Sequence, residues 1–590
     1  MKRAAICAAG LAVAACGSAS SQSSGAFGSG WQDDRGASIA RVQKRLAAAQ
    51  PPAAPAAVVG VGARGLVGVR LPGSARWTHA TALDARPVFA GNVVVASGGG
   101  SVFALDAATG KRLWAVSSDG RAVRGAGDDG KVTVVSLGRP RGSGSLLLAV
   151  GRDGSVRRRI EAEPELGTPA VLDGVAFVPW GNQYVSAIDV ASGAEEGRLL
   201  LREQVSRAVA IDGSLWFGEV GLTLFDEQVG TATAKGANRV APPPRALPGA
   251  PTWFFDGSVV MPVSSSARDR IRLYARPTRQ PLGFDSDRVS ATYFRIALGM
   301  SPPKAALRWV RTFDSDLIAG DGAAGGFVFC AANGKVHVVS ADGGSAPGAT
   351  LGEPLSACAV QGGTLTVPQT AQPESLAAQI RSALELREHD LYTAQAFLLQ
   401  ELGTLPDQEV TKTLIDVASS AATPPALLDT ARRFLAQRRN GANFMLEALA
   451  RHYDFLSDVL RPPPVGPLAD ALSAMNEAKA APLLARHLND PANPPDDIER
   501  AARALEKLAT VKELDELKTF FALYRATADE EPLVRAVLHT AAALVRIGGN
   551  DGQAIIERAA EDPLTHPDVK RGLAGLAPAK TAGDAGAAPG

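Results

Sequence analysis

The chain has 590 residues and a formal net charge of +1 at pH 7, because 61 Lys and Arg balance 60 Asp and Glu. This length is too great for one ordinary domain. The near-zero net charge provides no field that would attract a polyanion, which argues against nucleic acid as a partner.

The first residues are typical of a secretory signal. Met1-Lys2-Arg3 is positively charged, and residues 4–15 form an apolar run of twelve. A helix needs roughly 20 apolar residues to span a bilayer, so this run is too short to serve as a membrane span. We therefore predict a signal peptide over residues 1–15.

The signal ends in Val13-Ala14-Ala15-Cys16, which resembles the lipobox of bacterial lipoproteins. The resemblance implies that Cys16 is acylated and becomes the mature N-terminus, and two acyl chains already suffice for stable anchoring. The alternative is an ordinary Ala-x-Ala cleavage site followed by an unrelated cysteine. No aspartate follows Cys16, so nothing resembles the inner-membrane retention signal of enteric bacteria. We expect a lipid-anchored envelope protein, with the outer membrane favoured, facing the periplasm or the cell surface.

Residues 16–56 are rich in Ser, Gly, Ala and Pro, a composition that buries too little apolar surface to fold. They are predicted to form a flexible tether. Within them, "SIARVQKRLAAAQ" at 38–50 is compatible with a short helix.

The composition changes near residue 368. Residues 57–368 hold 44 glycines and six of the seven tryptophans, whereas residues 369–577 hold eight glycines and no tryptophan. Such a shift marks a domain boundary.

The first half reads as short strands separated by turns. Between residues 86 and 116, four runs of β-branched and aromatic residues alternate with turn signals such as Gly91-Asn92 and Ala107 to Gly110. Four short antiparallel strands make one blade of a propeller.

The unit recurs along the chain. "ALDAATG" at 104–110 is echoed by "AIDVASG" at 187–193 and by "LFDEQVG" at 224–230. Successive Asp-containing turns are 47, 36 and 37 residues apart, at Asp106, Asp153, Asp189 and Asp226, which is the spacing of propeller arrays. "GSVFALDAATGKRLW" at 100–114 resembles the repeat of pyrroloquinoline-quinone (PQQ)-type β-propellers, in which an Asp-x-x-x-Gly turn and a Lys-x-x-Trp strand form the outer hairpin of each blade.

Ring closure is also expected from the sequence. The domain begins with an outer hairpin at 66–77 that lacks inner strands, and it ends at 355–367 with strands that lack an outer hairpin. Together they would complete one blade and leave no open sheet edge. We count seven blades over 57–368, and the hairpin-like segment 292–310 leaves an eighth open.

The second half, residues 369–577, is predicted to be helical. Residues 496–509 place their apolar side chains on one helical face, with Asp496 or Asp497 as the N-cap, and the helix expected at 530–549 stops at Gly548-Gly549. Helix pairs recur every 35 to 45 residues, like HEAT or armadillo repeats. The alternative is an irregular helical bundle. Residues 578–590 are predicted to be a disordered tail.

Several motifs resemble catalytic or binding signatures but fit other readings better. "GVGARG" at 60–65 matches a dinucleotide fingerprint, yet a strand-like segment follows where a helix is required. "SPPK" at 301–304 has the Ser-x-x-Lys spacing, but two prolines stand where a helical turn is needed. "RRR" at 157–159 is expected on a solvated outer strand.

No metal or catalytic site is predicted. The seven histidines form no His-x-x-x-His set, and there is no Cys-x-x-Cys; they are His79, His337, His389, His452, His487, His539 and His566. The PQQ-type resemblance would carry over an adjacent-cysteine pair, and this chain has none. We therefore expect no cofactor and no catalytic residue.

Two cysteines remain after Cys7 leaves with the signal and Cys16 is acylated. Cys330 is expected in the second strand of the last full blade, and Cys358 in an inner strand of the closing blade. These strands would be neighbours, so the pair either forms a disulfide, which a periplasmic location permits, or stays as two buried thiols.

The combined features predict a scaffold. Propellers and helical solenoids present large surfaces and little chemistry of their own. The tether and the propeller together resemble the propeller lipoproteins of the outer-membrane β-barrel assembly machinery, although those end with their propeller. We expect a non-catalytic, membrane-anchored platform that binds envelope proteins. The alternatives are a quinone-linked or other propeller oxidoreductase, and a small-molecule sensor that uses the propeller channel.

Overall fold

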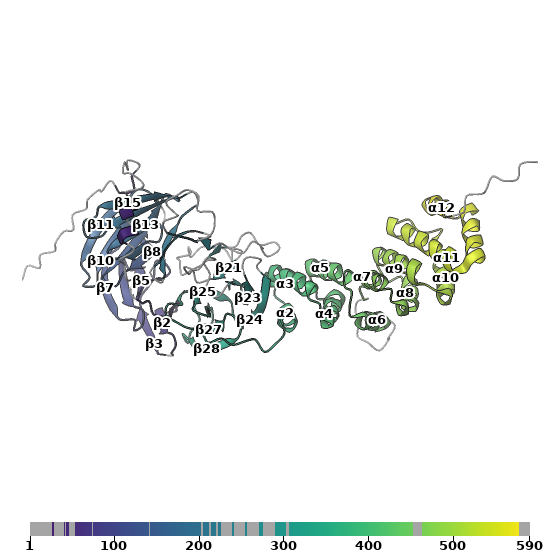
Figure 1. The fold of residues 1–590 in the computed structure, drawn as a ribbon, viewed down its shortest axis with the longest axis horizontal. Coiled ribbons are helices and arrows are strands. Elements are labelled where there is room, and N and C mark those ends of the chain that lie inside the picture. Colours follow the sequence, from purple (N-terminus) through teal and green to yellow (C-terminus); the bar gives the residue numbers. More distant parts are fainter. Residues whose placement is uncertain are drawn as a thin grey trace, which may run out of the picture. The chain divides into compact units, whose positions relative to one another are not determined.

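The computed structural model describes residues 26–28, 40–41, 43–45, 53–73, 75–140, 142–201, 204–211, 214–219, 222–225, 239–240, 254–255, 271–274, 289–301, 306–451 and 463–576. These residues fall into two compact units, the first ending at Glu374 and the second beginning at Ser375. The composition placed this boundary six residues earlier, between 368 and 369. The first unit is built from strands and the second from helices (Figure 1).

The described part of the first unit contains seven sheets, and six of them have their strands in chain order. The first three are β4–β7 (Val88–Ala90, Val93–Gly98, Ser101–Asp106, Arg112–Ser117), β8–β11 (Ala122–Asp128, Val132–Gly138, Ser145–Gly151, Val156–Ala162) and β12–β15 (Ala170–Leu172, Val175–Trp180, Tyr184–Asp189, Glu195–Leu200). The next three are β16–β19 (Arg207–Ile211, Ser214–Gly218, Leu222–Leu224, Arg239–Val240), β20–β24 (Phe254–Phe255, Ile271–Tyr274, Val289–Tyr293, Ile296–Ser301, Ala306–Thr312) and β25–β28 (Leu317–Ala323, Gly326–Ala331, Lys335–Ser340, Ser345–Thr350). All neighbouring strands are antiparallel except β20 and β21.

The sheets are the blades of a β-propeller. Innermost strands contact one another in the order β29, β4, β8, β12, β16 on one side and β21, β25, β29 on the other. Blades therefore pack face to face, which explains why inner strands such as β5 are buried along their whole length while outer strands such as β7 alternate. Segment 292–310, which left an eighth blade open, lies within β22 to β24 of the five-stranded sheet. Seven blades are formed by the described residues.

The closing blade joins the two ends of the domain. Its sheet has the order β29-β1-β2-β3, where β29 is Ala357–Gln361, β1 is Ala57–Gly62, β2 is Gly65–Arg70 and β3 is Arg76–Ala80. The expected division of two strands from each end was wrong, because three come from the N-terminal side and one from the C-terminal side. The apolar run "AVVGVG" is itself a buried strand, and Val58 pairs with Val360 across the seam.

A disulfide ends on β29, one of the two strands that form this seam. Cys330 in β26 and Cys358 in β29 are joined, with their Cα atoms 6.6 Å apart. Both side chains belong to one buried apolar cluster that also contains residues of β1 and β2. The bond thus links the last full blade to the closing blade.

Two tryptophans dock onto turns of the following blade. Trp77 Nε1 donates to the carbonyl oxygen of Ala107 at 3.2 Å, and Trp309 Nε1 donates to that of Ala341 at 2.9 Å. A Cβ at Gly110, where φ is +68°, would lie 2.4 Å from the Trp77 ring. The glycine of the Asp-x-x-x-Gly turn is therefore required both for its left-handed backbone and for the space that it leaves.

The second unit is helical throughout its described length. Its α-helices are α2 (Leu376–Leu384), α3 (Tyr392–Thr404), α4 (Gln408–Ser419), α5 (Pro425–Ala436), α6 (Ala442–Arg451), α7 (Val465–Ala474), α8 (Ala481–Leu488), α9 (Pro495–Leu508), α10 (Leu514–Tyr524), α11 (Glu531–Glu561) and α12 (Pro567–Leu573). Three short 3-10 helices precede α3, α8 and α10: η2 (His389–Leu391), η3 (Ala478–Ala480) and η4 (Val511–Glu513).

The helices form two rows. Odd-numbered helices α3 to α11 pack successively against one another, as do even-numbered helices α2 to α10, and each even helix also contacts the following odd one. Among the described residues, the helices that contact one another most extensively are near neighbours in the chain, which is how repeat arrays are built. The classification as HEAT or armadillo repeats stays a prediction.

One detail of the predicted helices differs in the structure and another is confirmed. Pro494 is the N-cap of α9, and Asp496 and Asp497 lie in its first turn. The expected stop at Gly548-Gly549 is confirmed, because Gly549 has a non-helical backbone, with φ 53° and ψ −130°, that divides α11 into two helices. Glycine adopts this backbone readily, so the first helix ends there and the second begins directly after it.

Candidate interaction surface

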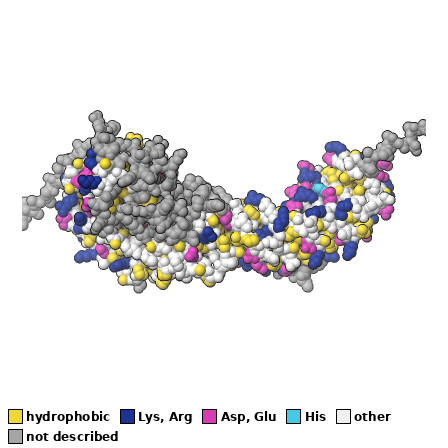
Figure 2. Space-filling view, in the orientation of Figure 1, with side chains coloured by type: hydrophobic (Ala, Val, Ile, Leu, Met, Phe, Trp, Pro, Cys, Tyr) yellow, Lys and Arg dark blue, Asp and Glu magenta, His cyan; other side chains and the backbone are white. Residues whose placement is uncertain are grey.

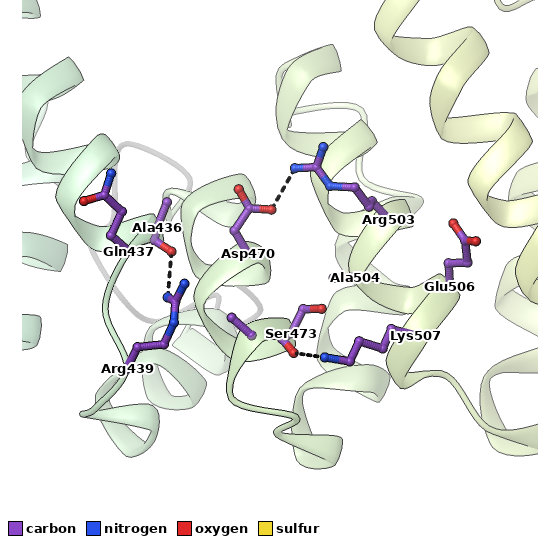
Figure 3. A pocket seen from close by; sticks show the side chains of 10 residues that line it. Ala436, Gln437, Arg439, Asp470, Ser473, Arg503, Ala504, Glu506 and Lys507 are labelled. Atoms are coloured by element: carbon purple, nitrogen blue, oxygen red, sulfur yellow. Dashed lines mark hydrogen bonds and ion pairs between the residues drawn. The ribbon is translucent and has the colours of Figure 1, made fainter.

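A groove runs over the ends of three odd-numbered helices in the second unit. Its volume is about 670 Å³, and it is lined by side chains of α5, α7, α9 and the residues that follow α5: Ala436, Gln437, Arg439, Asp470, Ser473, Ala474, Arg503, Ala504, Glu506 and Lys507. Figure 3 shows these residues on neighbouring helices, with Arg503 directed toward Asp470 and Lys507 toward Ser473. Most of the lining groups are polar or charged.

Bonds between helices hold the lining in place. Asp470 of α7 accepts from Arg500 Nη2 at 2.6 Å and from Arg503 Nη2 at 2.9 Å, both on α9. Lys507 Nζ donates to the carbonyl oxygen of Ser473, near the end of α7, at 2.9 Å. The dashed lines in Figure 3 mark the Arg503 and Lys507 contacts, which join α9 to α7.

Three cations and two carboxylates line the groove, and two of the cations, Arg439 and Lys507, bond backbone carbonyl oxygens and not carboxylates. Arg439 donates to the carbonyl oxygens of Arg438 and Ala436 at 2.8 and 3.3 Å. Lys507 likewise bonds a backbone carbonyl, while Glu506 lies 2.6 Å from His539 Nδ1 on α11. A cation at a helix C-terminus is favourable, because the last carbonyls carry partial negative charge. Arg439, Arg503 and Lys507, here called the groove cations, all remain exposed.

A buried ion pair supports the groove from beneath. Asp497 of α9 is 1 % exposed and bonds Arg432 of α5. Burial raises the pKa of Asp497, and the charge of Arg432 opposes that rise. The backbone N–H of Gly466 also bonds the carboxylate, and a Cβ at Gly466 would lie 2.4 Å from it. The pair therefore sets the spacing of α5, α7 and α9.

Basic and acidic side chains are interspersed on the helical unit beyond the groove, as Figure 2 shows. Arg535 of α11 bonds Glu499 of α9 at 2.8 Å, and Arg546 of α11 donates to the carbonyl oxygen of Ala509 at 2.6 Å. The contact between Lys507 and α7 is thus repeated one helix further along, between Arg546 and the end of α9.

The sites weighed in the sequence lie apart from this groove. "GVGARG" is the turn between β1 and β2, so it is a hairpin and not the start of a helix. Ser301 ends β23 and accepts from Arg308 Nε at 2.8 Å, whereas Lys304 lies outside the described residues. Cys16 and His452 also lie outside them. Among the residues that are described, no group of three His, Cys, Asp or Glu side chains could hold a metal ion.

The three arginines at 157–159 were expected on a solvated outer strand, and two of them also contact residues outside their own sheet. Arg158 donates to the carbonyl oxygen of Ala191, and Arg159 pairs with Asp119. Ala191 belongs to the next blade, and Asp119 lies in the turn between β7 and β8 that connects the preceding blade to this one. Arg158 also lies against Gly193, the same place that a tryptophan occupies at Gly110 and Gly343. The missing tryptophan of this blade is therefore replaced by an arginine, which a search for the Lys-x-x-Trp pattern could not detect.

The groove was not predicted, because its residues meet only after α5, α7 and α9 stack. The signal that could have found it is the repeated placement of Arg or Lys near the ends of successive helices. Within the described residues, no helix combines the length and the apolar character needed to cross a membrane.

Comparisons with solved structures return other propeller proteins at low similarity. BamB from Moraxella catarrhalis is 14 % identical, with a TM-score of 0.29, covering 52 % of this chain and 85 % of that one. The dihydro-heme d1 dehydrogenase NirN is also 14 % identical at a TM-score of 0.29, covering 49 % and 62 %. Hsv2p from Kluyveromyces lactis is 10 % identical at 0.28, covering 44 % and 74 %. No protein-family model matches the chain, and no curated protein sequence does.

Proposed function

We propose that this chain is a non-catalytic scaffold lipoprotein of the cell envelope, anchored through Cys16 and favouring the outer membrane. The lipobox-like residues support the anchor. The closed propeller and the stacked helices support the scaffold, because both expose broad surfaces made by repetition. The helices are taken to be HEAT-like repeats.

The observation that carries the scaffold proposal is the groove over α5, α7 and α9. Its three cations come from two elements, Arg439 from the residues after α5 and both Arg503 and Lys507 from α9, and they are held by bonds to backbone carbonyls or to Asp470. Because these bonds fix the side chains before a partner arrives, little side-chain entropy is lost on binding. The groove would take an extended, carboxylate-bearing segment of an envelope protein.

Affinity capture with matched charge reversals tests this proposal. The lipidated protein, its Lys507→Glu variant and its Arg571→Glu variant are purified from crosslinked, solubilised envelopes. Arg571 is 79 % exposed on α12 and does not line the groove, so it provides the control. We expect Lys507→Glu to lose partners that Arg571→Glu retains. Identical partner sets for all three proteins would contradict binding at the groove.

The anchor is tested separately. Mass spectrometry of the N-terminal peptide should show an acylated Cys16, and Cys16→Ser should release the protein from membranes. An unacylated mature N-terminus would overturn the anchor and leave the groove proposal standing.

A further inference from the structure

Part of the segment predicted to be a free tether is packed against the propeller. The described residues 26–28, 40–41 and 43–45, here called the docking segment, lie on the sheet β12–β15. Figure 1 draws them in purple beside β13 and β15. Residues 40–41 and 43–45 are helical, within the short helix expected at 38–50.

The first contact is an aromatic one. Phe27 is only 4 % exposed and belongs to the same buried cluster as Leu166, Val178 and Trp180. Its ring meets the Trp180 ring edge-on, with centroids 5.9 Å apart. Arg198 stacks over the same indole, its guanidinium carbon 4.9 Å from the centroid, and its Nη1 donates to the carbonyl oxygen of Gly28 at 2.5 Å. Phe27 thus lies in a site formed by an aromatic ring, a guanidinium group and buried apolar side chains.

The second contact is polar and lies on the same blade. Arg45 Nη1 lies 2.9 Å from Asp189 Oδ2 and 2.7 Å from Glu196 Oε1, and its Nη2 donates to the carbonyl oxygen of Asp173 at 2.9 Å. Arg41 Nη2 donates to the carbonyl oxygen of Glu196 at 2.8 Å. These four contacts from one helical turn reach the turn between β12 and β13, the end of β14, and β15. A freely moving tether would not maintain such a set of contacts.

Docking shortens the reach of the anchor. An extended chain spans at most about 3.6 Å per residue, so Cys16 lies within roughly 40 Å of the docked Phe27. A tether that ran free to the start of β1 at Ala57 would allow roughly 150 Å. The lipid and the β12–β15 blade are therefore kept close, while the blades on the opposite side of the ring are not.

We infer that the docking segment fixes the orientation of the propeller on the membrane, holding the β12–β15 blade toward the lipid surface in which Cys16 is anchored. This inference rests on the proposed lipid anchor. The opposite side of the ring, where β25–β28 lies three blades further along the chain order, then faces away from the membrane and is free to bind a partner.

Energy transfer to labelled lipids tests the orientation. A donor dye is attached to the full lipidated protein at Gln183→Cys, beside the docking site, or at Ser345→Cys on β28; both positions are exposed. The protein is reconstituted in vesicles of phosphatidylethanolamine and phosphatidylglycerol with an acceptor lipid. We expect more transfer from position 183 than from position 345. Phe27→Ala should abolish that difference, and Lys44→Ala, which changes an exposed residue of the same segment, should preserve it.

Flotation of the same samples separates the two proposals. Protein that fails to float with vesicles overturns the lipid anchor and the orientation with it. Protein that floats but shows equal transfer from both positions, or an unchanged difference in Phe27→Ala, overturns the orientation alone.

Discussion

The two units of this chain differ in whether the first and last repeats of each array contact one another. The propeller closes on itself: β1 pairs with β29, so Val58 meets Val360 across about three hundred residues of sequence. In the described part of the helical unit, the extensive helix contacts join helices close together in the chain, and no pairing of the first helices with the last is among them. In a closed ring, every blade depends on the pairing that joins the two ends, whereas in an open stack each repeat is stabilised by its neighbours. A destabilising substitution should therefore lower the stability of the whole propeller, but only of nearby helices in the helical unit.

The largest effect is expected from Trp309→Ala. Trp309 is 1 % exposed, donates to the next blade and fills the space left by Gly299 and Gly343. Truncating a buried aromatic residue costs about 3–5 kcal/mol. Urea unfolding followed by tryptophan fluorescence should show the propeller transition at lower urea, while helical circular dichroism keeps its midpoint. Trp309→Phe, which retains most of the apolar volume, should lose less. A shift of equal size in the helical transition would contradict the independence of the two units.

Removing the disulfide between the last full blade and the closing blade should have the next largest effect. The bond joins residues 28 apart in sequence, and closing a loop of that size restricts the unfolded chain by about 3 kcal/mol. Cys330→Ala with Cys358→Ala should lower the free energy of unfolding of the propeller alone. Adding a reductant to the wild-type protein should reproduce the loss and leave the double variant unchanged. A reductant effect that persists in the double variant would show that the bond is not its source.

In the helical unit, Arg432→Ala should cost about 2 kcal/mol at pH 7, because it leaves the carboxylate of Asp497 buried without its cation. The pKa of Asp497 is raised by burial, so the native state binds its proton more tightly than the unfolded state does. Stability then falls as the pH rises from the unfolded pKa through the folded pKa. Losing Arg432 raises the folded pKa further, so the deficit of the variant should shrink as the pH is lowered. Urea midpoints at pH 7 and at pH 5 measure this, and a deficit that grows toward pH 5 contradicts it.

The smallest effect is expected from Arg45→Ala, about 1 kcal/mol, since its partners are partly exposed. Burial acts to raise the pKa of Asp189, but hydrogen bonds from Ser192 and Arg45 outweigh it and leave the pKa below its ordinary value. This contribution is present above the unfolded pKa and is lost as the pH falls through the folded pKa. Limited proteolysis within residues 26–45 should therefore accelerate in acid for the wild-type protein. Arg45→Ala should be cleaved faster at neutral pH, and Lys44→Ala should match the wild type.

The sequence predicted the elements well where local chemistry decides them. Strands ended at glycine turns such as Gly91, and residues 496–509 were placed almost on α9. It failed where distant residues meet. Asp497 was expected to cap its helix but pairs with Arg432 of α5, and Arg158 takes the place of a tryptophan by reaching Ala191. The groove cations could not be grouped from sequence, because stacking brings together residues as far apart as Arg439 and Lys507.

By itself, the sequence determined the repeated strand-and-turn pattern of the blades, the helical periodicity and the division of the chain into a strand unit and a helical unit. These features follow from side-chain alternation and turn residues within a few positions. Only the tertiary structure decided that three strands close the ring from one end and one from the other, that Cys330 and Cys358 are joined, and that Phe27 is buried. Each of these depends on contacts between segments far apart in the chain, where shape and burial, and not local preference, select the partner.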